Sequence, residues 1–415
     1  MLDINKIRQE KETVKTALLK RMEPKDLDLD SVLSLDDERK KLLQQVEVLK
    51  AERNKYSKTK PSPEIIAKMK TIGEEIKELD EKVRVAETEL NDKLAALPNI
   101  PADDVLAGGK ENNKVIKTFG KKSEFKFSPK DHVQLATDLD IIDYERGVKM
   151  SGNGFWVYKG AGAVLEWALL SYFLEFHLKN KYTFMIPPFL LTEKSAYTSG
   201  HLPKFRDDLY WTQDQLCLNA TSEMMLGNYH RDEILDESQL PLKYCAYSSC
   251  FRREAGSYRK EERGMIRGHQ FNKIEMFHYT KPKHSWDSFK ELTANAEKLV
   301  DGLGLHFQSV QLAAGDASAA MAKTIDVEVW IPSMGIYKEV SSISNALDYQ
   351  ARRGNVRFKN KETGKNDFVH TLNASGLATS RLFPAILEQF QQKDGSIKIP
   401  KVLQKFTGFK KIEKS

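Results

Sequence analysis

The sequence is poor in cysteine. It has three, Cys217, Cys245 and Cys250, in 415 residues, and their spacing contains no CxxC pair. Disulfide scaffolds and structural zinc sites are built from closely spaced cysteines. The sequence therefore gives no indication of either, and we expect packed thiols in a reducing compartment.

Long apolar runs are also missing. The most apolar stretch, residues 163–176, is interrupted by Glu166 and Glu175 and is shorter than a membrane span. We expect it to form a buried helix, and we expect no membrane partner. The N-terminal "MLDINKIRQEKETVK" lacks the apolar core of a secretion signal and has acidic residues that transit peptides avoid, which predicts a cytoplasmic location.

Charge of one sign does not dominate either. The formal net charge is +6, which permits a polyanionic partner without requiring one. The position of the charges is therefore more informative than their sum.

Glycine is almost absent from the first hundred residues, where it occurs only at Gly73. Apolar residues recur there at alternating three- and four-residue steps, the spacing of a coiled coil. The first seam, with Arg39 and Arg53 between its apolar members, consists of Leu35, Leu42, Val46, Leu49 and Tyr56; the second consists of Met69, Ile72, Ile76, Leu79, Val83, Ala86 and Leu90. The prolines of "SKTKPSPE" separate the runs, so the pattern predicts an antiparallel two-helix arm over residues 34–96.

Two functions remain open for this arm. Periodicity alone favours an oligomerisation or spacer element with solvated faces. Lysines near the tip leave contact with a phosphate backbone open as the alternative. These lysines are Lys55, Lys58, Lys60, Lys68 and Lys70.

The chain changes character after the proline-containing linker "LPNIPADDV", residues 97–105. Short alternating runs such as "YCAYSSCF", "NKIEMFHY" and "DVEVWI" then follow, separated by loops and helices. This pattern is typical of an antiparallel α+β body. We therefore predict a helical domain over 1–105 and a second domain over 106–415.

Charges lie on predicted strands in "CFRREAGSYRKEERGMIRGHQFNKIEMF", residues 250–277. Alternation places Arg252 and Glu254 on one face of the first strand and Lys273 and Glu275 on one face of the second. Charges on an inward sheet face are unfavourable without a partner or a ligand. A solvated edge hairpin and cross-strand pairs such as Arg252 with Glu275 remain alternatives to a binding site.

A second segment has the same character and favours a binding site. "HTLNASGLATSRLFPAILEQFQ", residues 370–391, runs from a strand through small residues into a helix that starts near Arg381. Small residues let a ligand approach the backbone, and an arginine fork suits a phosphate. Such a helix start is more often structural when it occurs alone.

Five segments, in the order in which they occur along the chain, resemble segments of a bacterial-type seryl-tRNA synthetase, a class II aminoacyl-tRNA synthetase. "CFRREAGS" with "RGMIRGHQFNKIEMF" resembles the second class motif, "HTLNASGLATSR" the third and "YTFMIPPFL" the dimer motif. "TSE" at 221–223 and "KEVSSISNALDYQARR" at 338–353 resemble the serine-specific segments. The arm resembles the tRNA-binding coiled coil of the family.

The resemblance implies a class II catalytic domain with a mostly antiparallel sheet flanked by helices, assembled as a homodimer. It implies a serine–tRNA ligase that activates L-serine with ATP to seryl-adenylate and transfers serine to the 3′ end of tRNA(Ser). Whether tRNA(Sec) is also charged stays open. Mg²⁺ is implied with ATP, and no zinc is expected because the cysteine ligand set of zinc-dependent relatives is missing.

The resemblance also assigns residues to ATP. Arg252, Glu254 and Arg381 are implied as catalytic, with Arg252 on the α-phosphate and Phe271 stacked on adenine. Glu339 and Ser342 are implied as holding Mg²⁺. The full implied ATP-binding set is Arg252, Arg253, Glu254, Arg267, Phe271, Glu339, Val340, Ser341, Ser342 and Arg381.

The implied serine-binding set is Thr221, Ser222, Glu223, Glu275, Asn373 and Ser375. Within it we assign the ammonium of serine to Glu223 and the hydroxyl to Glu275 with Ser375. The loop 257–268 is expected over the site, against the tRNA end. Its charges Arg259, Lys260, Glu261 and Glu262 are read as solvated.

Some positions depart from the family pattern, namely Ala220, Ile343, Ala346 and Ser380. A catalytically inactive, synthetase-like RNA-binding or regulatory protein is the main alternative, and a ligase that charges a carrier protein is another. Degenerate relatives lose motif arginines and glutamates, and carrier-protein ligases lack the long arm. This chain retains the motif arginines and glutamates and has the long arm, so an active enzyme is the preferred hypothesis.

Overall fold

The computed structural model describes the chain except for residues 59–60, 256–263 and 415. The chain divides into two compact units, Met1–Ile100 and Pro101–Ser415. In the part of the chain described, none of the helices combines the length and apolarity needed to cross a membrane.

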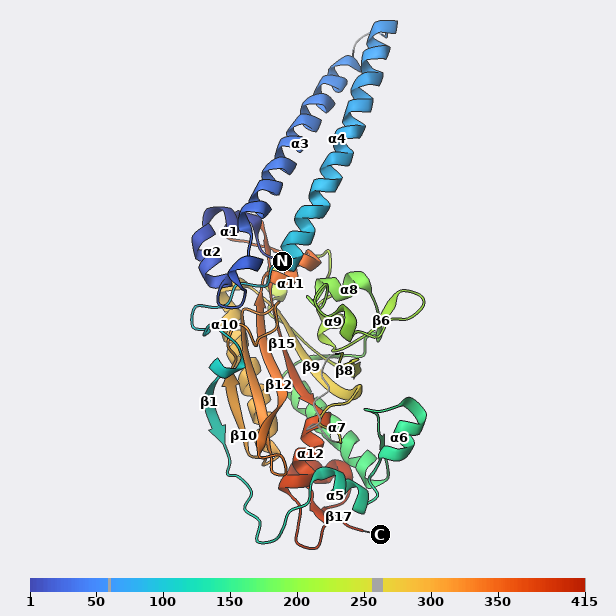
Figure 1. Cartoon of the computed structure of the whole chain (residues 1–415), viewed down its shortest axis with the longest axis vertical. Coiled ribbons are helices and arrows are strands. Elements are labelled where there is room, and N and C mark those ends of the chain that lie inside the picture. The colour runs from blue at the N-terminus through green and yellow to red at the C-terminus, as the bar shows by residue number, and fades with distance from the viewer. Residues whose placement is uncertain (59–60, 256–263, 415) are drawn as a thin grey trace. The chain divides into compact units, whose positions relative to one another are not determined.

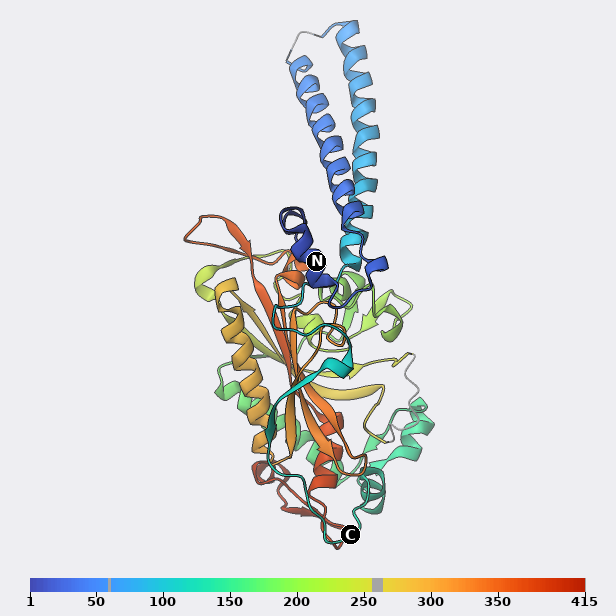
Figure 2. The same ribbon diagram turned by 60° about the vertical axis from the view of Figure 1, so that its left-hand side comes forward.

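The first unit is entirely helical. It contains α1 (Ile4–Gln9), α2 (Lys11–Leu18), the short 3₁₀ helix η1 (Pro24–Asp26), α3 (Leu29–Tyr56) and α4 (Pro63–Ala96). The side chains of Asp28 and Ser62 accept hydrogen bonds from the first turns of α3 and α4, and Pro63 occupies a first-turn position where no amide is needed. The two long helices run side by side (Figures 1 and 2), which confirms the predicted hairpin.

The predicted seam is the buried side of the pair. Val46 of α3 is buried, and so are five seam residues of α4, namely Ile72, Ile76, Val83, Ala86 and Leu90. Arg39 fits within the seam because its guanidinium contacts Asp36 at 2.9 Å and Glu87 of α4 at 3.6 Å. Burial alone would raise the pKa of Asp36, but hydrogen bonds from Lys40, Arg39 and Arg8 outweigh it and lower the pKa to about 2.

The second unit is an α+β domain. Its helices are α5 (His132–Asp138), α6 (Tyr144–Ser151), α7 (Ala161–Lys179), α8 (Glu193–Thr198), α9 (Glu223–Leu226), α10 (Ser285–Gly302), α11 (Tyr349–Gly354), α12 (Thr379–Gln389) and α13 (Gln404–Thr407), with 3₁₀ turns at Lys110–Asn112, Arg206–Asp208, Glu237–Gln239, Pro282–His284 and Lys401–Leu403. Its main strands are β1 (Lys114–Phe119), β4 (Thr183–Met185), β8 (Leu242–Phe251), β9 (Gln270–Thr280), β10 (Phe307–Gln311), β11 (Lys323–Ile331), β12 (Ile336–Leu347) and β15 (His370–Ala378).

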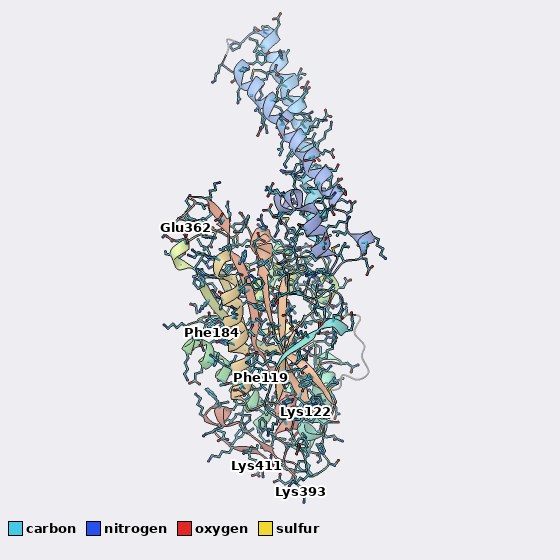
Figure 3. The ribbon with its side chains drawn as sticks, turned by 90° about the vertical axis from the view of Figure 1, so that its left-hand side faces the viewer. Phe119, Lys122, Phe184, Glu362, Lys393 and Lys411 are labelled. Carbon is cyan, nitrogen blue, oxygen red and sulfur yellow. The ribbon has the colours of Figure 1, made fainter. Side chains whose placement is uncertain are left out.

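These strands form one eight-stranded sheet in the order β1-β10-β11-β12-β15-β9-β8-β4. All neighbours are antiparallel except β4 and β8. Phe119 lies on β1 at one edge of the sheet (Figure 3). Its ring stacks on that of Phe307 in β10, with ring centroids 4.1 Å apart. The mostly antiparallel sheet flanked by helices confirms the expected fold class.

Smaller strands complete the unit in minor sheets. β7 (Ile234–Asp236), β13 (Arg357–Lys359) and β14 (Asn366–Phe368) form a three-stranded sheet. The remaining short strands pair two by two: β2 (Ile142–Asp143) with β3 (Val157–Tyr158), β5 (Leu190–Thr192) with β6 (Leu216–Leu218), and β16 (Ile397–Lys398) with β17 (Lys411–Ile412).

The two faces of the main sheet differ in polarity. Ile274 of β9, Ile343 of β12 and Ala374 of β15 belong to the apolar core, to which α7, α10 and α12 also contribute. The residues that alternate with them point to the other face, and these include Lys273 and Asn373. The polar face is the one that carries the site described below.

The hairpin of residues 250–277 forms as predicted, with one difference. β8 and β9 pair antiparallel, but β8 ends at Phe251. Arg252 and Glu254 therefore lie just beyond the strand, and Glu254 has a positive φ of 53°, a conformation that non-glycine residues seldom adopt. Alternation along the strand does not set the direction of these two side chains.

The predicted helix over 163–176 is present within α7, but its burial is incomplete. Leu165, Leu169 and Phe173 are buried in the core. Val164 and Trp167 are 41% and 62% exposed in the single chain. The helix is therefore apolar on two sides, of which the fold covers one.

Candidate active site

Two adjoining cavities open on the polar face of the sheet. The larger, of about 370 Å³, is lined by predicted residues from both the serine and the ATP sets, namely Thr221, Glu223, Arg252, Glu254, Arg267, Glu275, Glu339, Ser342, Asn373 and Ser375. The smaller is lined by Arg252, Glu254, Arg267, Phe271, Glu339, Val340, Ser375 and Arg381. Thus segments separated by up to 160 residues meet at one place.

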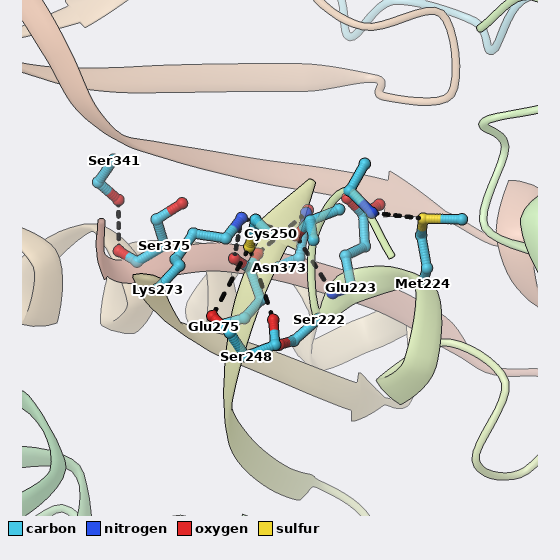
Figure 4. Close-up of polar contacts among 12 residues, drawn as sticks. Ser222, Glu223, Met224, Ser248, Cys250, Lys273, Glu275, Ser341, Asn373 and Ser375 are labelled. Carbon is cyan, nitrogen blue, oxygen red and sulfur yellow. Dashed lines mark hydrogen bonds and ion pairs between the residues drawn. The ribbon is translucent and has the colours of Figure 1, made fainter. Parts of the chain in front are cut away.

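The floor of the larger cavity is a buried charge network. Nζ of Lys273 lies 2.6 Å from Oε2 of Glu275 and donates to Oγ1 of Thr221 at 2.6 Å (Figure 4). Nδ2 of Asn373 donates to Oε1 of Glu275 at 3.4 Å, and Ser375 is opposite Glu275 in the β9–β15 ladder. Glu275 therefore pairs with Lys273, whereas the cross-strand partner suggested by the sequence was Arg252.

Glu223 lies at the start of α9 and is 7% exposed. Nε2 of Gln350 donates to its Oε1 at 2.6 Å, and Gln350 is itself held by Thr371, which donates to its Oε1 at 2.7 Å. Burial, reinforced by the negative charge of Glu275, raises the pKa of Glu223 to about 7. Gln350 thus fixes the orientation of the carboxyl group, which in its ionised form can pair with a cationic group.

The smaller cavity is predominantly cationic. The guanidinium of Arg252 lies 5.2 Å from the ring centre of Phe271 and donates through Nε to the carbonyl of Ala220 at 3.3 Å. Arg381, in the first turn of α12, donates to the carbonyls of Ile266 at 3.2 Å and Glu339 at 2.8 Å. These backbone contacts hold two forked donors at the cavity wall, an arrangement that suits an anionic ligand.

Glu254 and Arg267 form an ion pair between the two ends of the hairpin loop. Nε of Arg267 donates to Oε2 of Glu254 at 2.6 Å, and both side chains line both cavities. The pair places a carboxylate beside the arginines, which provides an acceptor for a neutral donor such as an amino group of a base.

Glu339 and Ser342 both line the larger cavity although they are three residues apart on a strand. Plain alternation would send them to opposite faces. Val327 of β11 is paired with Ser341, and the next residue, Glu328, is paired with Glu339. Val340 is therefore an extra residue in β12, a β-bulge that shifts the alternation of side chains between the two faces. This bulge brings the two predicted metal ligands together.

A divalent cation fits this corner. Asp326 is opposite Ser342 in the β11–β12 ladder, is 7% exposed, and its Oδ1 has no hydrogen-bond partner within the described part of the chain. Burial and the charge of Glu339 raise the pKa of Asp326 well above its usual range. Where the structure is described, no three His, Cys, Asp or Glu side chains are grouped as a complete metal site, so a cation here would need ligand oxygens as well.

Three predicted binding residues are absent from the described walls of either cavity. Ser341 is buried and donates to the carbonyl of Ser375 at 2.6 Å, while Ser222 is buried against the hydroxyl of Ser248 at 2.8 Å. Nη1 of Arg253 donates to the carbonyl of Asp207 at 3.2 Å. Ser222 and Ser341 are therefore buried away from the cavities, whereas Arg253 is exposed. The predicted loop residues Arg259, Lys260, Glu261 and Glu262 fall within 256–263 and lie outside the described residues.

Sequence reasoning did not assign some of the residues that the structure places at the site, and three of these take part in the contacts described above. These are Lys273, Gln350 and Asp326. Lys273 could have been found, because it shares a strand face with Glu275 two residues away. Gln350 and Asp326 carry no local signal, since their partners lie on other elements.

Comparison with known proteins identifies the family of the chain. The family profile for the seryl-tRNA synthetase N-terminal domain matches residues 1–101, and that for the tRNA synthetase class II core domain (G, H, P, S and T) matches residues 204–390. Serine–tRNA ligase 2 of Clostridium acetobutylicum is 54% identical over 99% of this chain and 100% of its own length. The chain belongs to the seryl-tRNA synthetase family.

Other members support the assignment. Serine–tRNA ligase of Petrotoga mobilis is 46% identical over 98% of this chain and 99% of its own. The crystal structure of seryl-tRNA synthetase from Pyrococcus horikoshii complexed with ATP has a TM-score of 0.93 at 36% identity and covers 100% of both chains. The resemblance to seryl-tRNA synthetases drawn from the motifs is thus confirmed.

Proposed function

We propose that the protein is an active serine–tRNA ligase that binds ATP and L-serine in the two adjoining cavities. The observation that carries the proposal is their shared wall: Arg252, Lys273, Glu339 and Ser375 line both. A carboxylate-bearing amino acid in one cavity would thereby face a phosphate in the other. That juxtaposition is what adenylate formation requires.

In the activation step, a carboxylate oxygen of serine attacks the α-phosphorus of ATP. The bond from that phosphorus to the bridging oxygen breaks, and pyrophosphate leaves with the electron pair. The arginines Arg252 and Arg381 would offset the growing negative charge, and their backbone contacts limit the reorganisation they need. Phe271, already beneath the Arg252 guanidinium, would stack on adenine, and Arg253, Val340 and Ser341 would support the nucleotide through the backbone.

The serine pocket combines two carboxylates with one buried lysine. Glu223 would bind the ammonium of serine, and Glu275 with Ser375 would bind the hydroxyl. Thr221, Ser222 and Asn373 complete the polar wall. Buried polar groups of this kind reject alanine, because the missing hydroxyl leaves them without a partner.

The corner formed by Glu339 and Ser342, with Asp326 behind them, would hold Mg²⁺ that enters with ATP. The ion supplies positive charge against the phosphates when it is bound. Glu339 would offer a carboxylate and Ser342 a hydroxyl to the ion, and the phosphates of ATP and water would provide the remaining ligands.

Transfer requires tRNA(Ser), whose 3′-terminal ribose hydroxyl attacks the seryl carbonyl as AMP leaves. We assign tRNA binding to the α3–α4 arm within the N-terminal domain of residues 1–105, with residues 106–415 as the catalytic domain. The tip carries Lys55, Lys58, Lys68 and Lys70, which are exposed, and Lys60 is outside the described residues. Aminoacylation of tRNA(Ser) and tRNA(Sec) in parallel tests whether both are substrates.

We also propose a cytoplasmic homodimer. The exposed apolar side chains of Val164, Trp167 and Ile186, on and after α7, support association through the predicted dimer motif. A catalytically inactive RNA-binding protein is disfavoured because Arg252, Glu275 and Arg381 all converge on the cavities.

The proposal is tested by ATP–pyrophosphate exchange with serine, threonine, alanine and glycine in parallel. Exchange with serine alone is expected, and Arg252→Ala should abolish it. Absence of exchange with every amino acid, from folded wild-type protein, would favour the inactive RNA-binding alternative.

A further inference from the structure

Glu166 of α7 is a buried carboxyl group that the proposed chemistry does not use. Its side chain is 2% exposed and lies behind the sheet face that carries the cavities. A carboxyl group in such a position is unfavourable unless it makes compensating contacts. The hydrogen bonds of Glu166 therefore indicate what compensates for the burial of its carboxyl group.

The carboxyl group ties together three elements. Its Oε1 accepts hydrogen bonds from Oγ1 of Thr379 at 2.6 Å and from Nδ2 of Asn272 at 2.8 Å. The carbonyl oxygen of Asn272, 3.1 Å from the same hydroxyl, is a second and more distant acceptor for its one hydrogen. One carboxyl oxygen of Glu166 in α7 thus joins the first residue of α12 to the beginning of β9.

Both partners are next to residues assigned to ATP. Asn272 directly follows Phe271, and Thr379 precedes Arg381 by two residues within the first turn of α12. No side chain caps the start of α12, so its first turn depends on contacts such as this one. Displacement of Thr379 would consequently move the turn that presents Arg381.

The second carboxyl oxygen has a different environment. Neither Oε2 of Glu166 nor the nearby hydroxyl of Tyr158 has a hydrogen-bond partner of normal geometry in the described structure. Burial raises the pKa of Glu166 to about 7. The group is thus about half neutral near pH 7. Glutamine imitates the neutral form in shape and in its acceptor oxygen.

We propose that Glu166 is a positioning residue for ATP, whose shared acceptor oxygen holds Phe271 of β9 and Arg381 of α12 in register with each other. This inference rests on the proposed function, because it takes the smaller cavity to be the nucleotide site. It assigns Glu166 no contact with either substrate. Its effect is exerted entirely through Asn272 and Thr379.

The test compares Glu166→Ala, Glu166→Gln and Thr379→Val in ATP–pyrophosphate exchange, with KM measured separately for ATP and for serine. Glu175→Ala serves as the matched control, since Glu175 is on the same helix but pairs with Lys179 and Lys405 at the surface. Thermal unfolding and calorimetric titration with ATP alone accompany each variant.

In Glu166→Ala, Nδ2 of Asn272 loses its acceptor and the hydroxyl of Thr379 keeps only the longer contact with the carbonyl of Asn272. KM for ATP should therefore rise about tenfold while KM for serine changes less than about twofold. Glu166→Gln and Glu175→Ala should resemble the wild type. Thr379→Val removes one of the two donors and should raise KM for ATP by about threefold.

An unchanged KM for ATP in Glu166→Ala would overturn the inference, as would equal losses for ATP and serine accompanied by a lower unfolding temperature. If Glu166→Ala does not fold, an unchanged KM for ATP in Thr379→Val would overturn it. Failure of the wild type to exchange with serine would count against the proposed function. The titrations with ATP would still separate that failure from a failure of the role assigned to Glu166.

Discussion

Lys273 and Glu275 project from the same face of β9 and form a buried ion pair, with Nζ 2.6 Å from Oε2 and the side chains 5% and 2% exposed. Glu223 lines the same cavity and its negative charge interacts with that of Glu275, so this cluster within the cavity combines two carboxyl groups with one lysine. Lys273 offsets one of the two negative charges, which leaves the other available to the ammonium group that we propose Glu223 binds. The balance of charges in the pocket therefore depends on Lys273.

Replacement of Lys273 by methionine should strongly impair serine activation. Removing one partner of a buried ion pair is unfavourable by about 3–5 kcal/mol, because the other charge stays buried and unpaired. We expect kcat/KM for serine to fall at least about 100-fold, at about 1.4 kcal/mol for each tenfold step.

The matched control is Lys243→Met. Lys243 of β8 pairs with Glu291 at 2.6 Å, but these side chains are 26% and 37% exposed. Exposed pairs contribute about 0–1 kcal/mol, so this variant should exchange at nearly the wild-type rate. Equal losses in the two lysine variants would contradict a specific role for Lys273.

The KM for serine should depend on pH through Glu223. The pKa of this carboxyl group is raised to about 7, first by burial and then by Glu275, and only its ionised form attracts an ammonium group. The group is about one-tenth ionised at pH 6 and about nine-tenths ionised at pH 8. We therefore expect KM for serine to be about tenfold higher at pH 6 than at pH 8.

The measurement is ATP–pyrophosphate exchange at saturating ATP over this pH range. Glu223→Gln should have a high KM for serine that no longer changes with pH in this way, because the amide does not ionise. If the wild-type KM were constant from pH 6 to pH 8, Glu223 would not be the ammonium ligand.

Deletion of residues 34–96, closed with a short flexible linker, should abolish aminoacylation of tRNA(Ser) and leave ATP–pyrophosphate exchange largely intact. The cavities are built entirely from residues beyond Ile100, so the activation step does not require the arm. Sedimentation of the shortened chain decides between the two functions considered for the arm. A monomer in place of a dimer would favour the oligomerisation alternative, and parallel loss of both catalytic steps would contradict the division of labour.

Local patterns predicted the parts of the fold that depend on neighbours in the chain. The three- and four-residue spacing placed Ile76 and Val83 in the seam of the arm, because a helix repeats its faces within two turns. Alternation placed Lys273 and Glu275 together on one face of β9, because a strand repeats its faces every second residue. Glu339 and Ser342 depart from this alternation because β12 contains one extra residue, Val340, opposite β11.

The sequence alone thus predicted the helical arm and the α+β body, and the family resemblance named many of the polar residues that line the cavities. Tertiary structure decided which groups face one another: Lys273 meets Thr221 across 52 positions, Gln350 orients Glu223 across 127, and Glu166 meets Thr379 across 213. The reason is physical, since periodicity reports which face a side chain occupies but not what the rest of the chain brings to that face. Burial then converts those encounters into the pairings and altered pKa values on which the site depends.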